Sequence, residues 1–251
     1  MTAFILKLIA CISMLIDHVG AVLRGAGVIH YYSKLSLYYA MRAAGRIAFP
    51  IYAFLLVDGA FHTRSRPKYL LRLLIFALIS EIPFDIAFNR HVLEFESQNV
   101  FFTLVLGLAA IIPVFCAAES TGKKRFAFII VSIVSTAVCS FAAWFLKTDY
   151  DFAGVLMIVF VTVMTLPVKY LEVSEAMRRT INSVAFLISV VAMCLMLDSR
   201  IEFFALAGVI LIAAYNGKKG YSDKYLKYAF YAYYPLHLLL LGLIFNLKSL
   251  S

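Results

Sequence analysis

Residues 4–23 read FILKLIACISMLIDHVGAVL, and this stretch decides how the rest of the chain is interpreted. A run of about 20 mostly apolar residues is long enough for one α-helix to cross a bilayer. Similar runs follow, so nine spans are predicted: 4–23, 44–62, 68–88, 100–118, 125–146, 152–170, 181–197, 201–215 and 228–246. The sequence therefore predicts an all-α polytopic membrane protein, a bundle of about nine transmembrane helices in a single domain, residues 1–251.

The composition of the whole chain supports this class. Hydrophobic residues make up 63% of the chain and charged residues 15%, against about a quarter in soluble domains. The net charge of +9 comes largely from short connections after the second, fourth, sixth and eighth spans, which places the N-terminus in the cytoplasm. Such connections favour contact with membrane lipid over a nucleic-acid partner. The four cysteines lie in apolar runs without a CxxC pair, so no disulfide framework and no metal site is expected.

Ionisable residues in the first span mark a candidate site, because a charge inside a bilayer is costly and usually functional. Lys7 and His18 are eleven residues apart, which places both on one helix face. Imidazole is the usual general base near neutral pH, so His18 is the candidate catalytic base, with a merely buried histidine as the alternative. Asp17 is the second candidate catalytic residue. Asp17 points about 100° away and is expected to pair with Arg46 of the second span.

Other polar residues in and near the spans sort by depth. Cations gather at the predicted inner mouth, where they would suit a phosphorylated ligand, although plain positive-inside topology explains them equally well. This cofactor-binding set is Lys7, His62, Arg64, Arg66, Lys68 and Arg72. A substrate or structural polar network is expected from Arg46, Asp58, Glu81, Asp85, Asn99, Asp151, Tyr234 and His237. Pro83 is expected to kink the third span, and Pro235 to break the ninth and border a cavity.

Six segments, in order along nearly the whole chain, resemble the TraX family. They are LIDHVG at 15–20, GRIAFPIYAF at 45–54, DGAFHTR at 58–64, SEIPFD at 80–85, NVFFTL at 99–104 and YPLHL at 234–238. The resemblance implies a bacterial inner-membrane protein linked to conjugation, in a family whose namesake acetylates pilin at its amino terminus.

The TraX family also looks like part of a wider transmembrane acyltransferase superfamily, which includes the acyltransferase-3 enzymes and the lysosomal heparan glucosaminide N-acetyltransferase. In that group a histidine of the first helix is catalytic and basic residues near the third helix bind acyl-CoA. By this resemblance His18 is the catalytic base, with Asp17 beside it, and Lys68 and Arg72 contact the phosphates of CoA. The double-arginine motif of acyltransferase-3 is not reproduced cleanly here.

The leading hypothesis is an integral-membrane acetyltransferase that takes its acetyl group from cytoplasmic acetyl-CoA. The acceptor on the outer side would be a pilin amino terminus or an envelope glycan, and transfer would be direct or through an acyl-histidine. A proton-coupled transporter would use the same buried histidine and carboxylates, and it is the first alternative. A non-catalytic conjugation assembly factor is the second.

Overall fold

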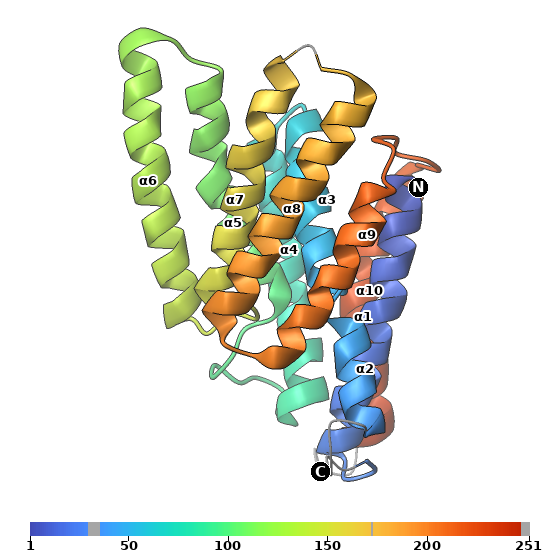
Figure 1. The fold of residues 1–251 in the computed structure, drawn as a ribbon. Helices are drawn as coiled ribbons and strands as arrows, with labels where there is room; N and C mark the ends of the chain where they lie inside the picture. The colour runs from blue at the N-terminus through green and yellow to red at the C-terminus, as the bar shows by residue number, and fades with distance from the viewer. Residues whose placement is uncertain (30–35, 172, 247–251) are drawn as a thin grey trace. The chain divides into compact units, whose positions relative to one another are not determined.

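The computed structural model describes residues 1–251 apart from 30–35, 172 and 247–251. The α-helices of the described residues are labelled in Figure 1. Their bounds are α1 Ala3–Gly25, α2 Leu37–Gly45, α3 Ala48–His62, α4 Arg66–Phe84, α5 Val100–Ala118, α6 Gly122–Phe145, α7 Asp151–Tyr170, α8 Glu175–Leu197, α9 Ala207–Ala213 and α10 Lys224–Asn246. A π-helical turn, η1 (Asp85–Asn89), continues α4, and a 3-10 helix, η2 (Arg200–Leu206), leads into α9.

Each of the nine predicted spans corresponds to helical structure. Seven helical stretches of the described chain are long and apolar enough to cross a membrane: Ala3–Gly25, Leu37–His62, Val100–Ala118, Gly122–Phe145, Asp151–Val168, Glu175–Leu197 and Tyr225–Phe245. The all-helical, multi-pass membrane class is thereby confirmed. The predicted spans 68–88 and 201–215 are helical but lie outside those seven. Helix α4 carries Arg66, Lys68, Arg72 and Glu81, and the second of these spans is a 3-10 helix followed by only 7 α-helical residues.

Two expectations about the spans need correction. The second span starts at Leu37 rather than at 44, and it consists of two helices that meet at Arg46 and Ile47. Pro50 explains the break, because it has no N–H to bond the carbonyl of Arg46 four residues earlier. The ninth span is not broken, since α10 runs through Pro235 without interruption. Near Pro83, the regular α-helix ends at Phe84 and a π-helical turn begins. Both prolines and π-helical turns are common where a helix is distorted.

The chain divides into two compact units, which are described separately. Unit 1 consists of Met1–Tyr52, Leu78–Phe95 and Ser199–Ser251, and unit 2 of Ala53–Ala77 and Glu96–Asp198. The division falls within α3 and α4, so each of these helices contributes residues to both units.

Unit 1 is organised around α1, which packs against α2 on one side and α10 on another. Phe4 and Lys7 contact Phe230, and His18 contacts His237, so α1 and α10 run parallel. The α1–α2 contact is close because of Gly45. A Cβ atom at Gly45 would lie 2.2 Å from the Cβ of Asp17, so only glycine allows this approach.

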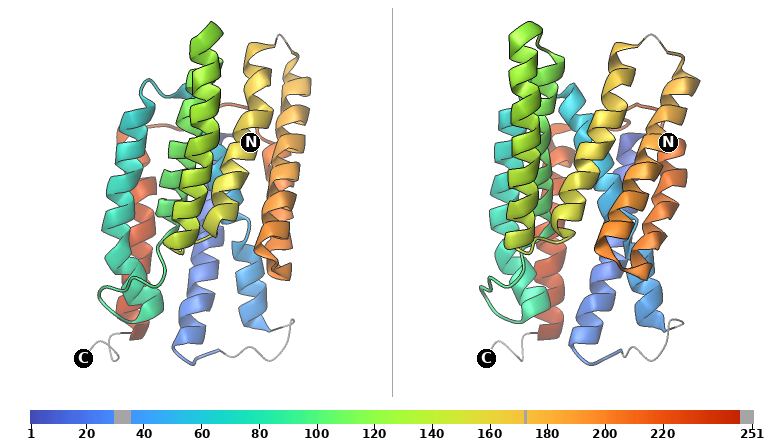
Figure 2. Two further views of the ribbon diagram at one scale, coloured as in Figure 1. Left: turned by 90° about the vertical axis from the view of Figure 1, so that its left-hand side faces the viewer. Right: turned by 60° about the vertical axis from the view of Figure 1, so that its left-hand side comes forward.

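Unit 2 contains two helical hairpins, α5–α6 and α7–α8, which Figure 2 shows in green and in yellow to orange. α7 packs against both α5 and α6, and Phe54 of α3 meets Phe186 of α8 edge to face. Helix α6 presents large apolar side chains outward. Only 11% of the residues in its most apolar 18-residue stretch are buried. In a bilayer this face of α6 would contact lipid.

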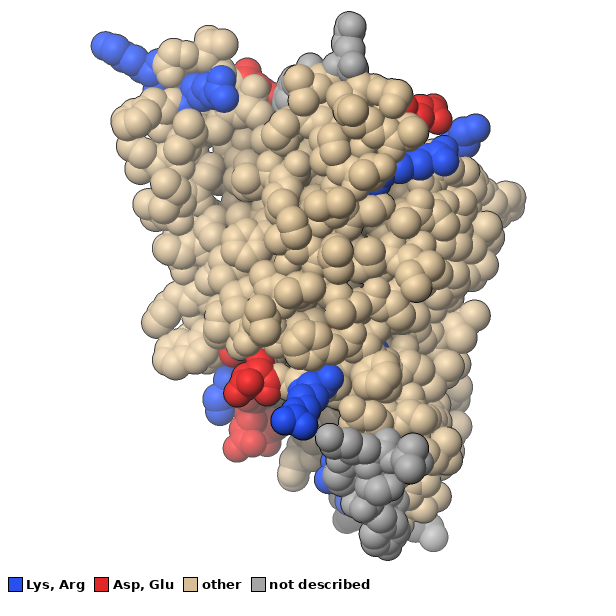
Figure 3. All heavy atoms as spheres, in the orientation of Figure 1, with Lys and Arg blue, Asp and Glu red and all other residues tan. Residues whose placement is uncertain are grey.

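The distribution of charge on the surface agrees with a membrane environment. Figure 3 shows one face of the molecule, on which Lys, Arg, Asp and Glu side chains stand chiefly near the upper and lower ends of the view. The surface between these ends is formed by other residues, as a lipid-facing belt requires.

Candidate functional site

The centre of the candidate site is a pair of histidines in unit 1. Nδ1 of His18, on α1, lies 2.7 Å from Nε2 of His237, on α10. The two ring planes are nearly parallel, at 7°. Because 2.7 Å is shorter than the roughly 3.5 Å at which rings stack, the imidazoles meet edge to edge through a hydrogen bond. Both residues are buried, with 9% and 7% of their surface exposed.

A second hydrogen bond assigns the protons in this pair. Nδ1 of His237 lies 2.7 Å from the backbone carbonyl oxygen of Tyr233, and a carbonyl can only accept. Nδ1 of His237 therefore carries the proton, and in the neutral ring Nε2 accepts from Nδ1–H of His18. The lone pair of neutral His18 is then on Nε2, for which the described residues provide no hydrogen-bond partner.

The residue that orients His237 is itself held by α1. The Tyr233 hydroxyl donates to the backbone carbonyl of Cys11 at 3.0 Å, and the Cys11 thiol shares a 3.0 Å hydrogen bond with the hydroxyl of Tyr52. A continuous set of contacts thus runs from Tyr52 through Cys11 and Tyr233 to the histidine pair. This set keeps α1 and α10 in the register that the His18–His237 bond needs.

Aromatic rings enclose the histidine pair. Phe88 of η1 lies edge-on to His18 with ring centres 5.3 Å apart, and Tyr234 lies edge-on to both histidines, at 5.9 Å and 5.7 Å. Tyr234 is buried, as its place in the expected polar network suggested. Rings on these sides restrict the movement of the imidazoles and keep the dielectric constant around them low.

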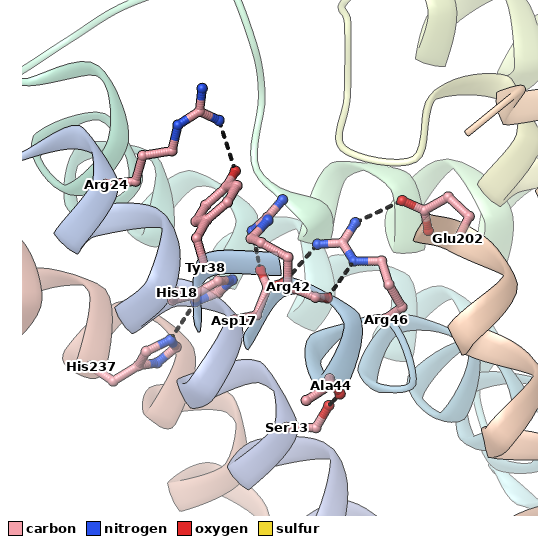
Figure 4. A network of polar contacts seen from close by, with 10 residues as sticks. All are labelled: Ser13, Asp17, His18, Arg24, Tyr38, Arg42, Ala44, Arg46, Glu202 and His237. Atoms are coloured by element: carbon pink, nitrogen blue, oxygen red, sulfur yellow. Dashed lines mark hydrogen bonds and ion pairs between the residues drawn. The ribbon is translucent and has the colours of Figure 1, made fainter. Parts of the chain in front are cut away.

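A network of ion pairs lies next to the histidine pair, on another side of α1 (Figure 4). Oδ1 of Asp17 pairs with Nη2 of Arg46 at 2.7 Å, which confirms the expected Asp17–Arg46 contact. Oδ2 of Asp17 pairs with Arg42, and Nη1 of Arg46 pairs with Oε1 of Glu202 at 2.8 Å. Both oxygens of Asp17 therefore pair with arginine. This carboxylate joins α1 to Arg42 and Arg46, which is a structural role in addition to any catalytic one.

The two arginines of this network are used differently. Arg46 is buried, and its Nε also donates to the carbonyl of Arg42 at 3.2 Å, so all three of its nitrogens have partners. Arg42 donates only through Nη1, and 25% of its side chain is exposed. Among the described residues, Nε and Nη2 of Arg42 have no hydrogen-bond acceptor.

Lys7 lies on the side of α1 that was expected. Its Nζ is 5.4 Å from the centre of the Phe230 ring, so Lys7 and His18 both face α10. The remaining predicted CoA contacts belong to unit 2.

In unit 2, Arg66 has firm partners inside the protein. It forms a bidentate pair with Glu119 at 2.6 Å and 3.2 Å, and its guanidinium lies 4.1 Å from the centre of the Phe115 ring. Arg72 lies over the ring of Tyr69, at 5.2 Å. Arg64 and Lys68 are exposed near the start of α4. These two are the exposed cations of the predicted set, whereas Lys7, Arg66 and Arg72 are partly covered.

Asp58 and His62 are four residues apart on α3, which places them on one helix face, and the two residues interact. Nδ1 of His62 donates to the backbone carbonyl of Asp58 at 2.7 Å and lies 3.6 Å from its carboxylate. His62 is exposed at the end of α3. Its role as a contact for CoA stays a prediction.

The other expected network residues form separate local contacts. Asp85 is buried in η1 and accepts from the side chain of Asn89 and the backbone N–H of Glu94, at 3.0 Å and 2.8 Å. Glu81 is buried in the last turn of α4. In unit 2, Asn99 caps α5 and donates to the carbonyl of Ala77 at 2.9 Å, and Asp151 accepts from the N–H of Phe152 at 2.6 Å.

Three residues of the site escaped sequence analysis, namely Arg42, Glu202 and Tyr233. Arg42 stands four residues before Arg46, a spacing that places both on one helix face and was a usable signal. Glu202 is a carboxylate inside a predicted span, and the cost of such a charge could also have identified it. Tyr233 acts through its backbone carbonyl, for which a sequence carries no signal.

Comparison with known proteins gives a consistent result. The family described as TraX protein matches residues 3–245. The probable fimbrial assembly protein FimC, serogroup H1, of Dichelobacter nodosus is 31% identical over 261 residues, and the match covers 96% of this chain and 94% of that protein. No solved structure matches the chain.

Proposed function

The chain belongs to the TraX family, and we propose that it is a membrane acetyltransferase that moves the acetyl group of acetyl-CoA to the amino terminus of a pilin. The observation that carries this proposal is the hydrogen-bond chain from the Tyr233 carbonyl through His237 to His18. It leaves Nε2 of His18 as the basic nitrogen, which is the arrangement that general-base catalysis needs.

The chemistry assigned to the site is a balanced acyl transfer. The neutral amine of the acceptor attacks the carbonyl carbon of the thioester, a C–N bond forms, and the π electrons of the carbonyl move to its oxygen. Nε2 of His18 takes a proton from the attacking nitrogen. The intermediate then collapses, the C–S bond breaks, and the departing thiolate takes the proton from His18 to give free CoA thiol.

His237 serves this sequence as a positioning residue. Its bond to Nδ1 of His18 fixes the tautomer and ring orientation of the base, and it stabilises the imidazolium that forms when Nε2 is protonated. A backbone carbonyl takes the place of a carboxylate as the final acceptor in the chain. Such a carbonyl brings no added charge into the bilayer, where a further unpaired carboxylate would be costly.

The choice of acceptor is supported from outside the site. The Dichelobacter nodosus relative is named as a probable fimbrial assembly protein, and fimbriae are built from pilins. Its match extends over 94% of its length. We propose that this chain lies in a bacterial inner membrane, with the N-terminus in the cytoplasm, where acetyl-CoA is available.

The test uses the full-length protein, purified in detergent and reconstituted in nanodiscs. Isotopically labelled acetyl-CoA is supplied with a peptide that has a free amino terminus, with the same peptide already N-acetylated, or with an oligosaccharide. Mass spectrometry follows the acetylated product and the released CoA. Label is expected on the free amino terminus alone, and His18→Ala is expected to lower the rate by about 10²- to 10⁴-fold.

Controls separate catalysis from folding. His91→Ala removes an exposed histidine of the loop after η1 and is expected to retain the wild-type rate. Full activity of a folded His18→Ala protein would overturn the mechanism. A wild-type protein that neither binds CoA nor cleaves the thioester would favour the proton-coupled carrier instead. Label on the oligosaccharide would show that the acceptor is a glycan and not a pilin amino terminus.

A further inference from the structure

Arg42 and Arg46 are one helical turn apart at the end of α2, yet within the described part of the chain only Arg46 has partners for all three of its nitrogens. Arg46 meets Asp17, Glu202 and the carbonyl of Arg42. Arg42 meets Asp17 through a single nitrogen. An arginine that is held by one edge keeps its remaining N–H donors in a fixed direction, and these donors suit a ligand oxygen that carries negative charge.

The position of Arg42 relates it directly to the proposed base. The carboxylate that holds Arg42 belongs to Asp17, the residue before His18 on α1. Figure 4 shows the Arg42 side chain extending from α2 to Asp17.

We propose that the open edge of the Arg42 guanidinium binds the oxygen that becomes negatively charged during acyl transfer. This inference rests on the proposed function, because it assigns an oxyanion site to the same reaction. When the amine attacks the thioester, the carbonyl electrons move to oxygen, and Nε–H or Nη2–H of Arg42 donates to that oxygen. When the C–S bond breaks, the electrons return and the interaction weakens.

The electrostatics of the network favour this role. The two carboxylates and two guanidinium groups carry no net charge together, so the network adds no unpaired charge to the membrane at rest. The developing oxyanion would meet a donor whose orientation is already set by Asp17. Preorganised donors of this kind act most strongly where water is excluded.

The partial exposure of Arg42 supports the same role. Its side chain is 25% exposed, against 10% for Arg46, although both pair with the same carboxylate. A buried guanidinium needs partners for all its donors, as Arg46 has, because an unsatisfied buried donor is costly. Arg42 instead leaves donors accessible at Asp17, the residue that precedes the base on α1.

The decisive comparison is between Arg42→Lys and Arg46→Lys in the acetyl-transfer assay. Lysine at 42 preserves the charge and the ion pair with Asp17, but it removes the forked donors. Arg42→Lys is therefore expected to keep the wild-type melting temperature and the KM for acetyl-CoA, and to lower kcat by about 10²- to 10³-fold. Arg46→Lys is expected to lower the melting temperature, since all three nitrogens of Arg46 are engaged.

Chemical rescue supplies a readout that a structural role would not move. Millimolar guanidinium is expected to restore part of kcat to Arg42→Ala, whereas urea at the same concentration is not. A wild-type kcat in Arg42→Lys would overturn the assignment of Arg42 but not the proposed function. The same holds if Arg42→Ala is inactive and guanidinium does not restore any of its kcat. A wild-type protein without acetyl transfer would refute the proposed function, and this inference with it.

Discussion

His18 and His237 share a 2.7 Å hydrogen bond although 219 positions separate them in the chain. Helices α1 and α10 run parallel in unit 1, and each supplies one ring. The Tyr233 carbonyl fixes the proton on Nδ1 of His237, and this sets the direction of the hydrogen bond between the two rings. The free nitrogen of His18 therefore depends on the register of α10, which the contact between Tyr233 and Cys11 maintains.

His237→Ala should slow acetyl transfer without abolishing it. The substitution removes the acceptor that fixes the His18 tautomer, and losing such an orienting partner typically costs about 10- to 100-fold. The effect should fall on kcat, because neither ring is assigned to the binding of CoA. Steady-state kinetics of the reconstituted protein checks this, with His91→Ala as the matched histidine control. A His237→Ala protein as inactive as His18→Ala would show that His237 takes part in chemistry itself.

Asp17→Asn should destabilise the protein strongly. The carboxylate is 8% exposed and meets two guanidinium groups, and breaking a buried pair usually costs about 3–5 kcal/mol. Unfolding in mixed detergent micelles measures the difference. Glu175→Gln is the control, because its pair with Arg179 is exposed at the surface and its loss should have no measurable effect. An unchanged stability of Asp17→Asn would mean that the ion-pair network is not maintained in the membrane.

Gly45→Ala should disturb the contact between α1 and α2. The added methyl group would lie 2.2 Å from the Cβ of Asp17, which forces the helices apart and costs about 1–3 kcal/mol or more. Thermal unfolding checks this expectation, with Gly25→Ala as the control. At Gly25 the nearest atom to an added Cβ is a side-chain nitrogen of Arg90 at 3.7 Å, an ordinary contact. Equal melting temperatures for the two variants would contradict the close approach of α2 to Asp17.

Lys68→Ala should raise the KM for acetyl-CoA and leave kcat almost unchanged. Lys68 is exposed at the start of α4, where a cation can meet a phosphate of the substrate. The effect should shrink as salt is added, since exposed charges are screened. Titration of KM against ionic strength for wild type, Arg64→Ala and Lys68→Ala tests this. A KM that is insensitive to both substitutions would assign these cations to membrane topology alone.

Much of the fold follows from the sequence, because the cost of exposing backbone polar groups to lipid forces apolar runs into helices. The nine predicted spans match helical structure for this reason, and α5 has the predicted bounds of 100–118. Helix boundaries near proline were harder. Pro50 divides the second span, whereas Pro235 is tolerated within α10, and local sequence does not distinguish these outcomes.

Part of the candidate site was also readable from spacing. The 3.6-residue period of the helix placed Lys7 and His18 on one face, and both do face α10. The cost of an unpaired carboxylate in lipid called for a cation near Asp17, and Arg46 provides it. These inferences succeed because they depend on one helix, or on the charge balance between two neighbouring ones.

The sequence by itself determined the membrane class and the helical spans, and it identified His18 and Asp17 as candidates for the site. Only the tertiary structure decided that His18 bonds His237, that Tyr233 orients the pair through its backbone, and that Arg42 keeps donors open while Arg46 does not. The physical reason is that helix periodicity is local, whereas a hydrogen bond between helices depends on their rotation and register. Those quantities are set by packing, such as the close approach at Gly45 and the contact of Tyr233 with Cys11.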